Sequence, residues 1–275
     1  MTFDVFSRNG QILPISEATM PLSNIEYAYG FGVYESIRVV KGKPLFLRQH
    51  LERLEASAKA IGLQHPFDIS TIDTWTREIV TYAKADALNL KMLLIGAKDS
   101  AHAQLFIIPL APLFPDKRLY VRGASVVSVV HERFMPQAKT LNMLPSYLSY
   151  SKAKATGCYD ALYVNRAGYI TEGTRTNFFA LRGRTLVSPP KHEILEGVTL
   201  LNVTKVAAQN GFTISYEDIA LASIGAFDGA FLTSTSSKIM PLSKIDTTEM
   251  KIPEALLELM KHFDAFIEAE VSSAG

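Results

Sequence analysis

Two charged residues, Lys139 and Glu172, stand in settings that suit covalent and acid–base chemistry. Lys139 lies among small and apolar residues in Gln137–Leu144, and this window contains no carboxylate. Desolvation disfavours the ammonium form, which makes the amine available as a nucleophile and suits a Schiff-base lysine. Glu172 follows a strand-like Gly-Tyr-Ile-Thr and precedes a glycine, so its carboxylate is expected at the rim of a sheet.

Each of these two residues has an ordinary structural alternative. A lysine in a loop is most often a solvated charge, and a glutamate before a glycine is a common turn. Taken together they supply the two groups that pyridoxal phosphate chemistry needs. These are a lysine that forms an imine and a carboxylate that keeps a pyridine nitrogen protonated.

The motifs around both residues resemble one known family. Ala138-Lys139-x-Leu141-Asn142, a helix, and then Thr171-Glu172-Gly173-x-x-x-Asn177-Phe178-Phe179 resemble the class IV aminotransferases, the fold-type IV pyridoxal phosphate enzymes. That family contains branched-chain aminotransferases, D-amino acid aminotransferases, (R)-selective amine transaminases and aminodeoxychorismate lyase. The resemblance covers nearly the whole chain. It implies a two-domain fold, pyridoxal 5'-phosphate as cofactor, and a homodimer.

The resemblance also assigns the cofactor site. Arg53 lies in a His-x-x-Arg-Leu motif like that of the family's phosphate-binding arginine, although an exposed helix arginine paired with a nearby Glu is the alternative. A glycine leads into a helix at Val198 and Thr199, where amides can face an anion, and Ser234 and Thr235 match a second phosphate loop. The implied catalytic residue is Lys139, and the implied cofactor-binding residues are Arg53, Lys139, Glu172, Val198, Thr199, Ser234 and Thr235.

Substrate-binding residues are expected at Tyr34 and Arg175. Tyr34 corresponds to an aromatic residue that lines the substrate pocket in relatives, and as a strand tyrosine it could equally belong to the core. Arg175 lies three residues after Glu172, where it could clamp a substrate carboxylate or form a surface ion pair. The Arg-x-His carboxylate trap of the well-known D-amino acid aminotransferases is absent or altered in the loop Gly96–His102.

The resemblance implies ping-pong exchange of an amino group between an amino acid and a 2-oxo acid. The arginine at position 175 resembles that of noncanonical D-amino acid aminotransferases and favours a D-amino acid donor. An L-branched-chain aminotransferase is an alternative. Aminodeoxychorismate lyase is another, because it shares the Lys-x-Leu-Asn pattern and eliminates pyruvate.

Composition limits the other function classes. The chain has 275 residues, a net charge of +1 and one cysteine, Cys158. The balanced charge argues against nucleic acid or an anionic membrane as partner, and the lone cysteine excludes an internal disulfide. No histidine spacing suggests a metal site, and no apolar segment is long enough to span a bilayer. We therefore expect a cytoplasmic enzyme that acts on small molecules.

Hydrophobic periodicity predicts an α+β fold with two domains, because strands and helices do not alternate strictly. The expected boundary lies in the proline-containing linker 109–117, giving a smaller α/β domain at 1–115 and a larger cofactor-binding domain at 116–275. Strands are predicted at 4–6, 11–13, 33–40, 44–47, 91–95, 104–109, 119–130, 160–165, 169–171, 177–181, 185–187 and 229–233. Helices are predicted at 48–61, 71–87, 146–156, 198–210 and 253–270.

Overall fold

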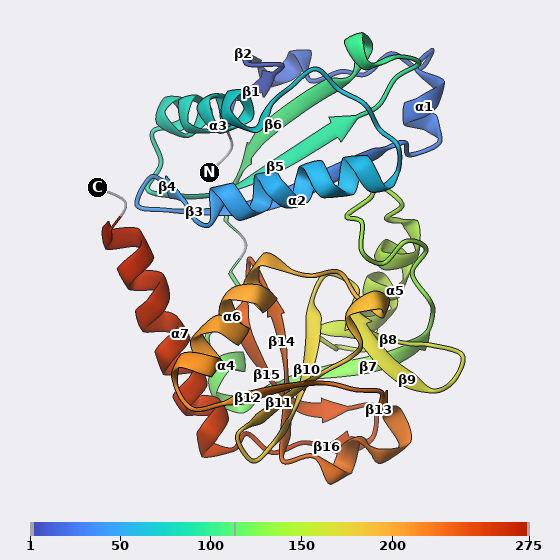
Figure 1. Cartoon of the computed structure of the whole chain (residues 1–275), viewed down its shortest axis with the longest axis vertical. Coiled ribbons are helices and arrows are strands. Elements are labelled where there is room, and N and C mark those ends of the chain that lie inside the picture. The colour runs from blue at the N-terminus through green and yellow to red at the C-terminus, as the bar shows by residue number, and fades with distance from the viewer. Residues whose placement is uncertain (1–2, 113, 274–275) are drawn as a thin grey trace. The chain divides into compact units, whose positions relative to one another are not determined.

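The computed structural model describes residues 3–112 and 114–273, which form two compact units (Figure 1). The first unit comprises Met1–Leu113, Ala138–Asn142 and Glu270–Gly275. The second comprises Phe114–Gln137 and Met143–Ala269. The segment that carries Lys139 therefore belongs by its contacts to the first unit, whereas a single cut at residue 115 would assign it to the second.

The first unit is built on a six-stranded antiparallel sheet with the order β2-β1-β6-β5-β3-β4. Its strands are β1 (Val5–Arg8), β2 (Gln11–Pro14), β3 (Gly32–Val40), β4 (Lys43–Pro44), β5 (Ala87–Ile95) and β6 (Gln104–Leu110). Its helices are α1 (Ile25–Ala28), α2 (Leu47–Ala60) and α3 (Ile69–Ala83), with 3-10 turns at Ile15–Glu17 and Ser100–His102.

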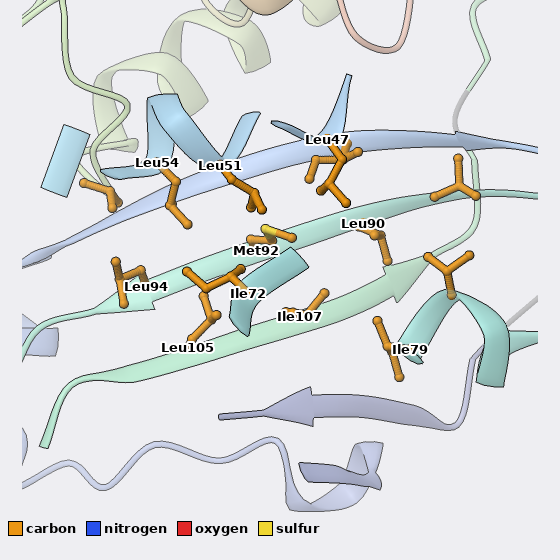
Figure 2. Close-up of a cluster of buried hydrophobic side chains, with 14 of the residues drawn as sticks. Leu47, Leu51, Leu54, Ile72, Ile79, Leu90, Met92, Leu94, Leu105 and Ile107 are labelled. Atoms are coloured by element: carbon orange, nitrogen blue, oxygen red, sulfur yellow. The ribbon is translucent and has the colours of Figure 1, made fainter. Parts of the chain in front are cut away.

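One face of this sheet packs against α2 and α3 (Figure 2). Leu47, Leu51 and Leu54 recur every three or four residues, so they form one apolar stripe on α2. The stripe meets buried strand residues that include Leu90 and Met92 of β5. Fully burying a side chain of this size stabilises the fold by about 1.5–3 kcal/mol. This packing fixes the position of α2 over β3.

The segment 139–141 pairs with the first residues of β3. The amide of Leu141 donates to the carbonyl of Gly32, and the amide of Tyr34 donates to the carbonyl of Lys139, each at 2.9 Å. β4 pairs only with Val39 and Val40 at the far end of β3. The first half of this edge of β3 is therefore available to hold the lysine segment as a short extra strand.

The second unit contains a ten-stranded sheet ordered β12-β11-β10-β14-β15-β7-β8-β9-β13, with β16 paired to β15. β9 also pairs with β10 through Glu172 and Asn177, so six of the strands, from β10 round to β9, close into a ring. The strands are β7 (Ala124–Val130), β8 (Asp160–Val164), β9 (Tyr169–Gly173), β10 (Asn177–Arg182), β11 (Thr185–Ser188), β12 (Thr213–Tyr216), β13 (Ile219–Ala220), β14 (Gly229–Ser234), β15 (Lys238–Ile245) and β16 (Thr248–Glu249).

The helices of this unit are α4 (Leu119–Arg122), α5 (Leu144–Ala155), α6 (Val198–Gln209) and α7 (Glu254–Ser273), the last of which ends in residues of the first unit. Short 3-10 turns lie at Lys191–Glu193 and Leu221–Ala226. None of the helices in the described ranges is both long and apolar enough to cross a membrane.

The expected α+β fold is confirmed, and most of the expected elements are present within a few residues. The single strand predicted at 119–130 is wrong, because Leu119–Arg122 forms a helical turn and Gly123, with φ of +78°, separates it from β7. The helix predicted at 71–87 ends four residues early, where Lys84 adopts a left-handed conformation. In the predicted linker, Pro109 belongs to β6, and Leu113 lies outside the described residues.

Candidate active site

Lys139 and Tyr34 come together in the first unit. The Lys139 Nζ lies 4.4 Å from the centre of the buried Tyr34 ring, and the Lys139 amide donates to the Ser57 Oγ at 3.1 Å. The Nζ of Lys91, a residue that sequence patterns did not single out, lies 3.8 Å from the same ring centre. Burial lowers the pKa of Lys91, and the nearby charge of Lys139 lowers it further. The amines of Lys91 and Lys139 thus both lie close to the Tyr34 ring.

Arg53 lies on α2 and contacts β3, the strand that carries Tyr34. Its Nε and Nη2 contact the two carboxylate oxygens of Glu35 at 2.7 and 2.8 Å. The Nδ1 of His50, one helical turn earlier, contacts the same carboxylate at 2.8 Å. Glu35 is completely buried and the Arg53 side chain is 13% exposed. The glutamate that pairs with Arg53 therefore comes from β3 and not from its own helix, as the alternative expected from sequence would require.

Glu172 lies near the end of β9 in the second unit and is buried. The Nε of Arg133 forms an ion pair with its Oε1 at 2.8 Å, and the amide of Leu195 donates to its Oε2 at 3.4 Å. An arginine next to a buried carboxylate favours the ionised form, which is the form that can hold a proton on a neighbouring base.

Val198 and Thr199 are the first two residues of α6, and both are buried. Gly197 precedes them, and no side chain caps the helix there. The Nδ2 of Asn177 donates to the carbonyl of Leu195 at 2.7 Å, so β10 holds the segment that leads into the helix. Amides of a first helical turn have no acceptors within the helix, and an anion at this position would be favoured.

Ser234 and Thr235 begin the turn between β14 and β15. The Ser234 Oγ lies 2.6 Å from the Ser237 Oγ and accepts the Ser237 amide at 3.1 Å, so this hydroxyl serves the turn itself. The Thr235 side chain makes no hydrogen bond with any described residue. The buried Thr233 Oγ1, in β14 just before the turn, also lacks a hydrogen-bond partner among the described residues. The Thr235 hydroxyl is thus available to an outside group.

Arg175 lies in a turn whose two neighbouring residues, Thr174 and Thr176, are hydrogen-bonded to Asp160. The hydroxyls of Thr174 and Thr176 donate to the two oxygens of the buried Asp160 at 2.5 and 3.0 Å. Burial raises the pKa of Asp160, and the hydrogen bond from Thr174 and the charge of Arg175 oppose that rise. The exposed Arg175 guanidinium stacks over the Tyr150 ring at 3.9 Å and makes no ion pair with the described residues.

The loop Gly96–His102 closes on itself. The Nδ1 of His102 lies 2.6 Å from the Asp99 Oδ1, and both side chains are largely exposed. This hydrogen bond lowers the pKa of Asp99. Among the described residues, no cluster of histidine, cysteine and acidic side chains could hold a metal ion.

The structure adds three residues to those expected from sequence: Glu35, Lys91 and Arg133. Glu35 carries a usable signal, because a charge interrupts the alternating apolar row Val33, Ile37 and Val39. Lys91 carries a similar but weaker one within β5. Arg133 had no readable signal, since its partner Glu172 lies 39 residues away in the chain.

The chain is similar in sequence and fold to several known proteins. The family model "Amino-transferase class IV" matches residues 32–245. A protein of Methanocaldococcus jannaschii, provisionally named a branched-chain-amino-acid aminotransferase, is 28% identical over 255 residues, which cover 86% of each chain. A D-alanine aminotransferase of Bacillus licheniformis is 25% identical over 250 residues, 86% of this chain and 87% of the relative.

Among solved structures, a branched-chain aminotransferase from Thermoproteus uzoniensis, crystallised with norvaline, superimposes with a TM-score of 0.89. It is 25% identical in sequence, and the match covers 98% of this chain and 96% of that one. The similarity therefore extends over both units, and relatives of both substrate types share it.

Proposed function

The chain belongs to the class IV aminotransferases, which are pyridoxal 5'-phosphate enzymes, and on this premise we propose that it moves an amino group from a D-amino acid to a 2-oxo acid. The observation that carries the proposal is the fixed position of Lys139. Its backbone is tied to β3 and α2, and its amine lies over the Tyr34 ring.

The residues present suit this cofactor. A phosphate needs cationic and N–H donors, and the chain offers the Arg53 guanidinium, the uncapped first turn of α6, and the Thr235 hydroxyl. A pyridine nitrogen needs a buried acid, and Glu172 is one. Gly197 also fits, because a Cβ there would lie 2.1 Å from the Asn177 Oδ1 and would disturb the entry into α6.

When bound, pyridoxal phosphate supplies an aldehyde that takes up the amino group and a ring that accepts the electron pair of the broken Cα–H bond. Lys139 would hold the cofactor covalently through its Nζ and, as a free amine, would move the proton between the substrate Cα and the cofactor. Glu172, with Arg133 as counterion, would keep the ring nitrogen protonated. A 2-oxo acid would be the substrate of the second half-reaction.

Arg175 supports an amino acid as donor, and its resemblance to the arginine of noncanonical D-amino acid aminotransferases favours the D form. Its turn is held by Asp160, and a guanidinium presented on an aromatic ring is suited to bind a substrate carboxylate. Replacing Arg175 by Ala should raise the KM for amino acids more than for simple amines. Equal effects on amino acids and amines would remove Arg175 from substrate binding.

The second candidate is an L-branched-chain amino acid aminotransferase, which the relatives of that name favour. A third candidate, aminodeoxychorismate lyase, is distinguished by release of pyruvate from aminodeoxychorismate without an amino acceptor. All three would use the same lysine and differ in the walls of the substrate pocket.

A homodimer forms part of this proposal. Leu144, Tyr147 and Leu148 lie on one face of α5 and are 65%, 67% and 57% exposed. They are spaced three and four residues apart, which makes a continuous apolar strip. A second copy of the chain is the partner that we infer for this strip.

The absorbance spectrum of the purified protein tests the proposal. D-Alanine, D-glutamate, L-leucine and an (R)-amine are added in separate cuvettes, and loss of the yellow colour reports the first half-reaction. Bleaching by the D-amino acids alone supports the proposed donor, whereas bleaching by L-leucine alone assigns the enzyme to the branched-chain group. A protein that takes up no pyridoxal phosphate would refute the role of Lys139.

A further inference from the structure

Glu35 occupies a position where a charge is unfavourable. It lies on β3 between Val33 and Ile37, which point to the same side of the strand and are fully buried in the core beneath α2. Its own side chain is 0% exposed. A carboxylate in such a place must be compensated by charge and hydrogen bonds, because its desolvation costs several kcal/mol.

Two residues of α2 supply that compensation. His50 and Arg53 are three residues apart, so they lie on the same face of the helix, and both contact Glu35. Burial raises the pKa of Glu35, but Arg53 and His50 outweigh it and hold this pKa far below its usual range. Burial is also the largest reason why the pKa of His50 is lowered, so the imidazole is neutral and donates its Nδ1–H to the carboxylate.

Stability alone is a poor explanation for this arrangement. Replacing a buried ion pair by apolar residues of similar volume is often neutral or stabilising. What the pair does provide is orientation, because a guanidinium that is bound through Nε and Nη2 to both oxygens of a rigid carboxylate is fixed in plane and in direction. The contact with Glu35 uses the edge of the guanidinium that carries Nε and Nη2.

We infer that Glu35 is a positioning residue, which together with His50 orients the Arg53 guanidinium to receive the cofactor phosphate. This inference rests on the proposed function, since it assumes that Arg53 binds that phosphate. The buried Glu35 carboxylate would thus hold the Arg53 guanidinium in its binding orientation before the cofactor binds. Glu35 itself touches neither cofactor nor substrate in this role.

The test compares two ligands of the apoprotein that differ only in the phosphate. Dissociation constants for pyridoxal phosphate and for pyridoxal are measured by absorbance titration, and their ratio is the phosphate preference. Glu35→Gln removes the charge and one acceptor, and we expect the phosphate preference to fall roughly tenfold. Glu35→Asp keeps a counterion for Arg53 but draws it back by one methylene, and it should lower the preference as well. Glu52→Gln, which breaks the exposed Arg48–Glu52 pair on α2, is the matched control and should leave the ratio unchanged.

The outcomes distinguish the positioning role of Glu35 from the phosphate-binding role of Arg53. If both Glu35 variants bind the two ligands more weakly but at the wild-type ratio, Glu35 is only structural and the inference fails. Arg53→Ala tests the underlying assignment, because it must lower the phosphate preference if Arg53 binds the phosphate. An unchanged ratio in Arg53→Ala refutes the phosphate role of Arg53. A lowered ratio there, with wild-type ratios in both Glu35 variants, refutes the positioning role alone.

Discussion

At the scale of single residues, two buried carboxylates of the candidate site each form an ion pair with an arginine. Glu172 is 2% exposed and its cationic partner is Arg133. Glu35 is 0% exposed and its cationic partner is Arg53. A carboxylate that loses such a partner is stranded in a medium of low dielectric, and its pKa rises. The charge of each glutamate therefore depends on its neighbouring arginine.

Arg133→Leu tests this dependence at Glu172. Without the arginine, the pKa of the buried Glu172 carboxyl rises, so a larger fraction of it is neutral and cannot stabilise a protonated ring nitrogen of the proposed cofactor. We expect kcat to fall roughly 10- to 100-fold, and the absorbance of the bound cofactor should titrate at a different pH. Arg182→Leu, which breaks the exposed Arg182–Glu217 pair in the same unit, is the control. An unchanged kcat and spectrum in Arg133→Leu would contradict the argument.

The pH dependence of stability tests the charge of Glu35. Its pKa in the folded state is lowered, so the ion pair stabilises the fold fully above the ordinary glutamate pKa of about 4.3 and is lost as the pH falls toward the folded value. In urea unfolding of the apoprotein, wild type should exceed Glu35→Gln in stability at pH 7. Below about pH 4 the difference in unfolding free energy between wild type and Glu35→Gln should decrease by up to about 1.4 kcal/mol per pH unit.

A suitable comparison is Glu258→Gln, because the pKa of Glu258 is also lowered, to about 2, by its hydrogen bond to Arg184. That pair is solvent-exposed, so added salt should reduce the stability difference between wild type and Glu258→Gln. The stability difference between wild type and Glu35→Gln should not change with salt. A wild-type advantage over Glu35→Gln that stays constant down to pH 3 would show that Glu35 is not charged in the fold.

At the scale of elements, the start of α6 is positioned by close contact. Gly197 has an ordinary φ of −66°, so a side chain there is excluded by space and not by backbone strain. An added Cβ would displace the Asn177 side chain, which would then lose its hydrogen bond to Leu195. The segment that leads into α6 would then shift, and the amides of Val198 and Thr199 would shift with that segment.

Gly197→Ala should therefore lower both stability and cofactor affinity. We expect a loss of about 1–3 kcal/mol in unfolding free energy, typical of overpacking, together with a weaker dissociation constant for pyridoxal phosphate. Gly225→Ala serves as control, because a Cβ at Gly225 would make only an ordinary contact of 3.4 Å. Wild-type affinity in Gly197→Ala would mean that the helix start can shift without consequence.

Elements with strong periodicity could be predicted from sequence, and contacts between elements could not. The stripe of α2 and the hairpin of β1 and β2 are local patterns, so they were found. The segment 119–130 was mispredicted because Leu119, Tyr120 and Val121 favour strands, whereas Gly123 adopts a φ of +78°, which no extended strand contains. β15 was missed because it contains Pro241, which usually argues against a strand inside a sheet.

The candidate site divides in the same way. Lys139, Glu172 and Arg53 stand in motifs that a sequence displays, and their roles remain predictions. Their partners depend on which strand or helix lies opposite, and this is decided by packing across dozens of residues. Glu35 could have been flagged as a charge in an apolar row, but nothing in the sequence connects it to Arg53.

At the scale of the whole molecule, the site residues expected from sequence are divided between the two compact units. Tyr34, Arg53 and Lys139 belong to the first unit, and the second contains Glu172, Arg175, Val198, Thr199, Ser234 and Thr235. The net charge of +1 gives the chain little electrostatic repulsion between copies. The proposed self-association would therefore depend on apolar surface, such as the strip on α5.

Leu148→Lys tests whether a second copy covers this strip. Leu148 lies one and four residues from Tyr147 and Leu144, so a lysine there would place a charge within the proposed interface. We expect the wild-type protein to sediment as a dimer at micromolar concentration and the variant to shift toward the monomer. Leu257→Lys on α7 changes a leucine that is 40% exposed, and it should leave the dimer intact. A monomeric wild type, or a variant as dimeric as the control, would assign the strip on α5 to some other use.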